Sequence, residues 1–170
     1  MVSKTAGPPA DASPVLTPAE QRALVHQLTH DVLADTAPEE LPQFEASASQ
    51  YLDNPGQKIQ PKSDEMLGFG LEIIVPLTPY IVAAATQVVR FIAKVLSDAA
   101  EEELKPVAVR WVRQLFHREP APVPAEPLPA RLTEQIRDIA ISVCRDLGAD
   151  QGDAAVVADA IVGRLTTAPR

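Results

Sequence analysis

The hydrophobic positions near the start of the chain recur with helical spacing. They are spaced by one, three, four and one residues, and they are Leu24, Val25, Leu28, Val32 and Leu33. This pattern predicts one apolar face of a helix that runs to about Asp35. The preceding "TPAE" predicts how the helix begins, with Thr17 as the N-cap, Pro18 in the first helical position and Glu20 as a capping-box acid.

A second helix is predicted directly after the first. In "TAPEE", Thr36 resembles a further N-cap, and the helix would continue through "LPQFEASASQYL", with Pro42 either in its first turn or marking a late start. The turn-forming residues "DNPGQ" at 53–57 would end it. We therefore expect a helical hairpin with an acidic outer surface over the first third of the chain.

The most apolar stretch is "LGFGLEIIVPLTPYIVAAATQVV" at 67–89, in which Glu72 is the only charged residue. Its internal "TP" predicts a helix with Thr78 as cap and Pro79 as first residue, running from 79 to 104 and ending before Pro106. Apolar residues at spacings of four and three form a seam along this helix: Ile81, Ala85, Val88, Ile92 and Val95. The opposite side would carry Ala83, Gln87, Arg90, Lys94 and Asp98.

This stretch could be the core helix of a soluble protein or a segment that enters a membrane. The uncharged run from Ile73 to Val89 is 17 residues long, whereas a spanning helix needs about 20. Pro76 and Pro79 interrupt its first half, and lipid on all sides would not require the polar side. The pattern favours a soluble core helix, and insertion of 66–96 is the alternative. The lead-in residues need a partner or lipid to cover them: Phe69, Leu71, Ile74 and Leu77.

Residues 105–118 contain four Lys or Arg and no acidic residue, so they form a basic patch in an acidic protein. Its candidate contact residues are Arg110, Trp111, Arg113 and Phe116. Trp111 could be buried in the core while the arginines face the acidic run at 101–103. The same helix could instead lie on an anionic membrane surface.

The C-terminal part begins with the run "EPAPVPAEPLPA" at 119–130, whose five prolines predict an extended linker. Residues 131–168 then predict two helices separated by Gly148, with Asp150 or Asp153 as cap of the second. The apolar positions are Leu132, Ile136, Ile139, Ala140, Val143, Cys144 and Leu147 in the first helix, and Val156, Val157, Ile161 and Leu165 in the second. So small a unit should dock on the main body, bind a partner or dimerise.

These patterns predict an all-α fold. We expect a small helical bundle with a long central amphipathic helix, plus a C-terminal helical hairpin on a Pro-rich linker. The expected division is a disordered tail at 1–16, a main domain at 17–118, a linker at 119–130 and a two-helix unit at 131–168. The composition agrees, because 46% of the residues are hydrophobic but only 4% are aromatic, which favours a core of Ala, Val, Leu and Ile.

The formal net charge of −8 argues against a nucleic-acid partner, which would need a basic face for phosphates. The single cysteine, Cys144, excludes an internal disulfide and a thiolate metal cluster. The N-terminus lacks the apolar core of a secretion signal. We therefore expect a cytoplasmic protein, with peripheral or inserted membrane association as the alternative.

We find no recognised nucleotide-binding or hydrolase motif in the sequence. His26 and His30 are four residues apart, but two ligands do not make a metal site, and the Glu of a zinc-protease motif is missing. Cys144 lies on an apolar face and His117 in the basic patch. We expect no catalytic residue, metal, cofactor or small-molecule substrate.

The expected function is that of a non-enzymatic helical adaptor or regulatory protein that acts through protein–protein contacts. Its partner would be another protein or a second copy of the chain. The alternative is a membrane-active or membrane-associated helical protein that uses the apolar segment 66–96 and the basic helix 105–118.

Overall fold

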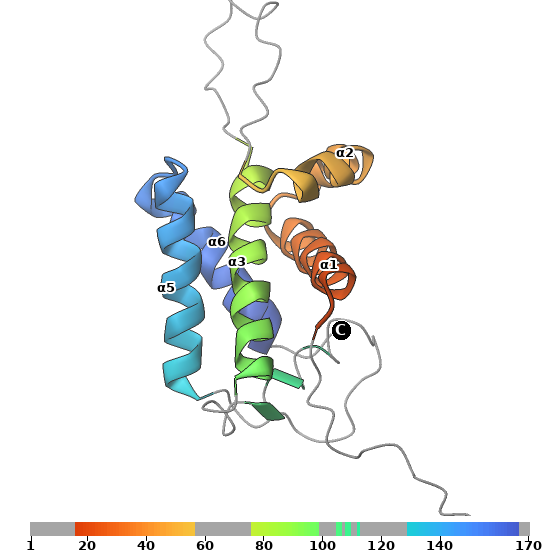
Figure 1. Ribbon diagram of the computed structural model, residues 1–170. Coiled ribbons are helices and arrows are strands. Elements are labelled where there is room, and N and C mark those ends of the chain that lie inside the picture. Colours follow the sequence, from red (N-terminus) through yellow and green to blue (C-terminus); the bar gives the residue numbers. More distant parts are fainter. Residues whose placement is uncertain are drawn as a thin grey trace, which may run out of the picture.

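The computed structural model of the protein describes residues 16–56, 76–98, 105–106, 108–109, 112 and 129–166. Within these residues the chain is an all-α bundle, as the sequence predicted (Figure 1). Several predicted segments lie outside the described residues: the tail at 1–15, the lead-in at 66–75, the acidic run at 101–103, most of the basic helix and the linker at 119–128.

The first helix, α1 (Pro18–Thr36), begins as predicted. The hydroxyl of Thr17 accepts a hydrogen bond from the backbone N–H of Glu20 at 3.2 Å, and the Glu20 carboxylate accepts one from the Thr17 N–H at 2.7 Å. These reciprocal bonds lower the pKa of Glu20, chiefly because the Thr17 backbone N–H stabilises the charged form. The capping box thus fixes the start of the bundle.

The prediction that Thr36 caps the second helix is wrong. Thr36 is the last residue of α1, and its hydroxyl donates to the backbone oxygen of Val32 at 2.7 Å. A short 3₁₀ turn, η1 (Pro38–Glu40), separates it from α2 (Leu41–Asp53). Pro42 lies in the first turn of α2, as predicted, where its missing N–H leaves no bond unmade. Only Ala37 and the 3₁₀ turn therefore connect α1 to α2, in place of the loop with a capping Thr36 that the sequence predicted.

The central helix, α3 (Thr78–Ser97), differs from its prediction at both ends. It begins one residue early with Leu77 as N-cap, and the Thr78 side chain makes no capping bond to its own helix. It ends at Ser97 rather than 104, so Pro106 does not stop it. Ala83, predicted on the polar side, is only 6% exposed. Gly56, just after α2, lies beside it, because a Cβ atom added at Gly56 would be 3.6 Å from the Ala83 Cβ.

The C-terminal hairpin consists of α5 (Ala130–Asp146) and α6 (Gln151–Thr166). Gly148 has a φ of 90°, and the N–H of Ala149 donates to the oxygen of Cys144, so the helix ends as a Schellman motif. The Asp150 carboxylate accepts from the N–H of Asp153 at 2.8 Å, which confirms Asp150 as cap. Of the four apolar positions named in this second helix, Val157, Ile161 and Leu165 are buried in the core, whereas Val156 is 48% exposed.

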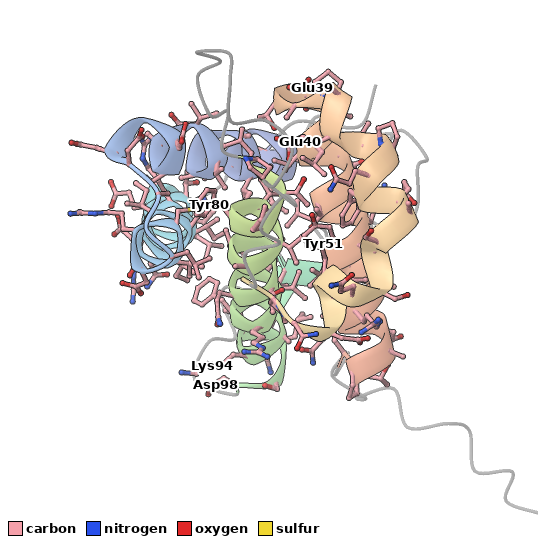
Figure 2. The ribbon with its side chains drawn as sticks, turned by 90° about the horizontal axis from the view of Figure 1, so that it is seen from above. Glu39, Glu40, Tyr51, Tyr80, Lys94 and Asp98 are labelled. Atoms are coloured by element: carbon pink, nitrogen blue, oxygen red, sulfur yellow. The ribbon has the colours of Figure 1, made fainter. Side chains whose placement is uncertain are left out.

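Seen from above, α3 lies between the α1–α2 pair and the α5–α6 pair (Figure 2). Thirteen of its 20 residues are buried. The hairpin's buried residues belong to the same hydrophobic core as those of α1 and α3. The guanidinium of Arg164 in α6 also binds the Asp31 carboxylate of α1 at 2.7 Å. The hairpin therefore packs on the main body, which was one of the three expected ways for so small a unit to be stabilised.

Candidate functional site

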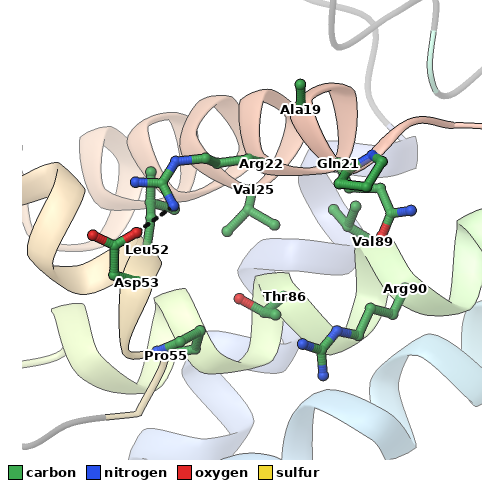
Figure 3. A pocket seen from close by; sticks show the side chains of 11 residues that line it. Ala19, Gln21, Arg22, Val25, Leu52, Asp53, Pro55, Thr86, Val89 and Arg90 are labelled. Carbon is green, nitrogen blue, oxygen red and sulfur yellow. Dashed lines mark hydrogen bonds and ion pairs between the residues drawn. The ribbon is translucent and has the colours of Figure 1, made fainter.

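A groove of about 480 Å³ lies where the start of α1, the end of α2 and the middle of α3 meet (Figure 3). It is open to solvent, and α1, α2 and α3 all contribute to it. Its lining residues are Pro18, Ala19, Gln21, Arg22, Val25, Leu52, Asp53, Pro55, Thr86, Val89 and Arg90. We refer to this set as the α1–α2–α3 groove.

The hairpin topology creates one end of the groove. Because α2 runs back along α1 after a short turn, the last residue of α2 comes next to the first turns of α1. Arg22 and Asp53 meet there in an ion pair of 2.7 Å (Figure 3). Their side chains are 44% and 61% exposed, so this pair contributes at most about 1 kcal/mol to stability.

The floor of the groove is apolar. Val89 is fully buried beneath it, Val25 is nearly so, and Leu52 is half-buried. Thr86 points from α3 into the space below α1 (Figure 3). Its hydroxyl already donates to the backbone oxygen of Val82 at 2.7 Å, so that hydroxyl proton is used within the helix. An apolar group of a ligand could therefore rest on this floor without leaving a donor unpaired.

Arg90 supplies a positive charge at the rim of the groove. It is exposed, and within the described part of the chain its guanidinium has no hydrogen bond or ion pair. Arg22, by contrast, is already bound to Asp53. The two arginines and the one aspartate give the lining a net charge of +1, opposite in sign to the chain as a whole.

Of the predicted contact and seam residues, those that the structure describes do not line this groove. Leu77 is half-buried at the start of α3, where its N–H donates to the Glu40 carboxylate at 2.8 Å. The five seam residues of the central helix, Ile81, Ala85, Val88, Ile92 and Val95, are all buried in the core. The remaining predicted contacts lie outside the described residues: Phe69, Leu71, Ile74, Arg110, Trp111, Arg113 and Phe116.

The groove itself was missed by the sequence analysis. Arg90 was placed on the polar side of the central helix, but nothing in the pattern indicated what would lie beside it. Arg22 and Asp53 are 31 positions apart, and only the hairpin brings them together. The predicted hairpin was the usable signal, because an antiparallel pair places the start of one helix beside the end of the next.

The two histidines of α1 do not share a site. The Nε2 atom of His26 lies 3.5 Å from Glu45, and its ring packs against Phe44 with centroids 5.3 Å apart. The Nδ1 atom of His30 lies 3.4 Å from Asp31. Among the described residues, no group of three or more His, Cys, Asp or Glu is arranged to hold a metal ion. Each imidazole therefore has its own carboxylate neighbour within the bundle.

Cys144 lies in the core, as its place on an apolar helix face predicted. Burial, and secondarily the negative charge of Asp153, raises the pKa of its thiol to about 11. The sulfur lies 4.0 Å from the backbone oxygen of Tyr80 in α3. A neutral thiol in this setting packs as a small apolar group and is a poor nucleophile.

One helix in the described part of the chain, α3, is long and apolar enough to cross a membrane by length and composition. Most of that stretch is buried inside the bundle, and the core helix of a soluble protein meets the same criterion. This finding is compatible with either a soluble or a membrane-associated protein.

No family model, curated protein or solved structure matches this chain.

Proposed function

We propose that this protein is a non-enzymatic helical adaptor or regulatory protein that binds another protein through the α1–α2–α3 groove. The observation that carries the proposal is the groove itself, with an apolar floor and a charged rim formed by three helices. Such a combination is typical of grooves that receive a segment of another polypeptide.

The walls of the groove favour a chain segment over a small molecule. Pro18, Ala19, Asp53 and Pro55 line it and are exposed. Small-molecule sites bury most of the ligand surface. Walls as open as these would leave much of a small ligand exposed to solvent. A segment of a partner would cover only one side of itself in the groove and remain solvated on the other.

A groove-filling variant tests the proposal. Thr86→Trp places a large ring in the groove, and Ser142→Trp places the same ring in a separate open pocket on α5. The wild-type chain and both variants would serve as bait in extracts of the producing cells, after circular dichroism has verified their folds. We expect a specific set of proteins to bind the wild type and Ser142→Trp but not Thr86→Trp. Equal capture by all three baits would contradict a role for the groove.

The second candidate function is membrane association, which the length and apolar character of α3 favour. Here the bundle would open so that α3 enters the bilayer. In α3 the two basic residues, Arg90 and Lys94, both lie in the C-terminal half, which leaves an uncharged stretch from Thr78 to Val89. Flotation of the full chain with anionic vesicles would support this candidate, while a monodisperse protein that does not float would contradict it.

A further inference from the structure

We propose that the partner segment for the α1–α2–α3 groove is acidic and amphipathic: an aliphatic side chain packs on Leu52 and a neighbouring carboxylate binds the guanidinium of Arg90. This inference rests on the proposed function, because it specifies what kind of polypeptide the same groove binds.

The charges of the groove carry the argument. Asp53 already forms an ion pair with Arg22 at 2.7 Å, whereas Arg90 has no ion-pair or hydrogen-bond partner among the described residues. A guanidinium presents paired N–H donors that match a carboxylate, and such charge-assisted bonds are stronger than neutral ones. A basic partner would meet two arginines and only one carboxylate, which Arg22 already holds.

The overall charge of −8 does not oppose this choice at short range. At physiological ionic strength, interactions between exposed charges are largely screened beyond about 8 Å. The nearest groove charges, Arg22, Asp53 and Arg90, therefore decide which partner charge is accepted. More distant acidic groups mainly slow the approach of an acidic partner.

The apolar floor supplies the second half of the recognition. Leu52 is half-buried and Pro55 is exposed at the end of α2, while Val25 closes the floor from α1. All three line the same groove, so an aliphatic side chain that enters it would meet an apolar surface. Acidic and aliphatic groups on one face of a short helix would satisfy both the floor and Arg90 at once.

The test uses the full chain and a displayed library of short peptides that sample acidic, basic, polar and aliphatic residues. We expect the wild type to enrich peptides in which Asp or Glu accompanies Leu, Ile or Val. Arg90→Glu should weaken the best acidic peptide by about fivefold to tenfold and favour Lys or Arg in its place. Lys94→Glu, which reverses an exposed cation one turn away in α3 but outside the groove lining, should change the affinity by less than about twofold.

The outcomes separate this inference from the proposed function. If enriched peptides carry no acidic residue, or bind Arg90→Glu as tightly as the wild type, the inference is wrong while the groove still binds protein. If they bind Thr86→Trp unchanged, they do not use the groove and both proposals fail. Failure to enrich any peptide, together with Arg90-dependent binding to phosphatidylserine vesicles, would contradict the inference and favour the membrane alternative.

Discussion

The carboxylate of Glu40 accepts hydrogen bonds from both the backbone N–H and the hydroxyl of Thr78, 38 positions later in the chain. It also accepts the N–H of Leu77, so one side chain from η1 satisfies two of the free donors at the start of α3. The negative charge lies where the helix dipole favours it. The central helix is thus capped by a residue of the preceding hairpin.

Replacing Glu40 should therefore destabilise the bundle. We expect Glu40→Ala to lower the free energy of unfolding by about 1–2 kcal/mol, because two backbone donors lose their partner in a half-buried setting. Urea denaturation followed by circular dichroism measures this loss. Glu39→Ala, the neighbouring exposed acid, is the control and should change stability by less than about 0.5 kcal/mol. Equal effects of the two variants would contradict the capping role.

Thr29 should be a site where a substitution stabilises the protein. Its side chain is fully buried, and within the described part of the chain its hydroxyl has no hydrogen-bond partner. Thr29→Val replaces that hydroxyl with a methyl group of similar size, so we expect stability to rise by about 1 kcal/mol. The matched variant is Thr36→Val, which removes a hydroxyl that donates to Val32 on the same helix. The melting temperature of Thr36→Val should fall or stay constant. A rise in the melting temperature of both variants would contradict the idea that the unpaired hydroxyl of Thr29 is the destabilising group.

A side chain at Gly56 should destabilise the protein. Its φ is 83°, and a Cβ atom there would lie 3.0 Å from a methyl of Leu147 in the α5–α6 turn. Gly56→Ala should cost about 1–2 kcal/mol of stability through strain and displaced packing. Gly163, inside α6, has open space around it, so Gly163→Ala should stabilise by about 0.5–1 kcal/mol. Thermal unfolding should show a lower melting temperature for Gly56→Ala and a higher one for Gly163→Ala than for the wild type.

The thiol of Cys144 should respond to pH in a defined direction. Its pKa in the folded state is raised from 9.0 to about 11, so this contribution to stability is complete below pH 9 and is lost as the pH rises toward 11. In that window the unfolded chain releases the proton while the folded chain keeps it. We expect slow reaction with a thiol reagent at pH 8 in the folded protein and rapid reaction in urea. Equal rates in both states would show that the thiol is not buried.

Helix existence and type could be predicted from local pattern, because capping residues and apolar spacing act within a few residues. Thr17, Pro18 and Glu20 form a box that is complete in sequence, and Asp150 and Gly148 mark their turns in the same way. The start of α3 could not be predicted so well, since its donors are satisfied by Glu40 rather than by Thr78. Sequence alone does not show a cap that comes from another element.

The groove could not be predicted for the same physical reason. Arg22, Leu52 and Arg90 belong to three helices, and their proximity depends on how those helices pack. Ala83 likewise lies beside Gly56, which precedes it by 27 positions, because α2 packs against α3. Periodicity identifies the face that a helix buries, but not the residues that cover it.

Site-specific photocrosslinking tests the central claim most directly. A benzophenone side chain at position 86 would lie in the groove, and the same group at position 142 would lie in the separate open pocket on α5. We predict that irradiation in the producing cells joins position 86, but not position 142, to another polypeptide. Equal crosslinks from both positions, or adducts of position 86 with lipid alone, would contradict a groove that binds protein.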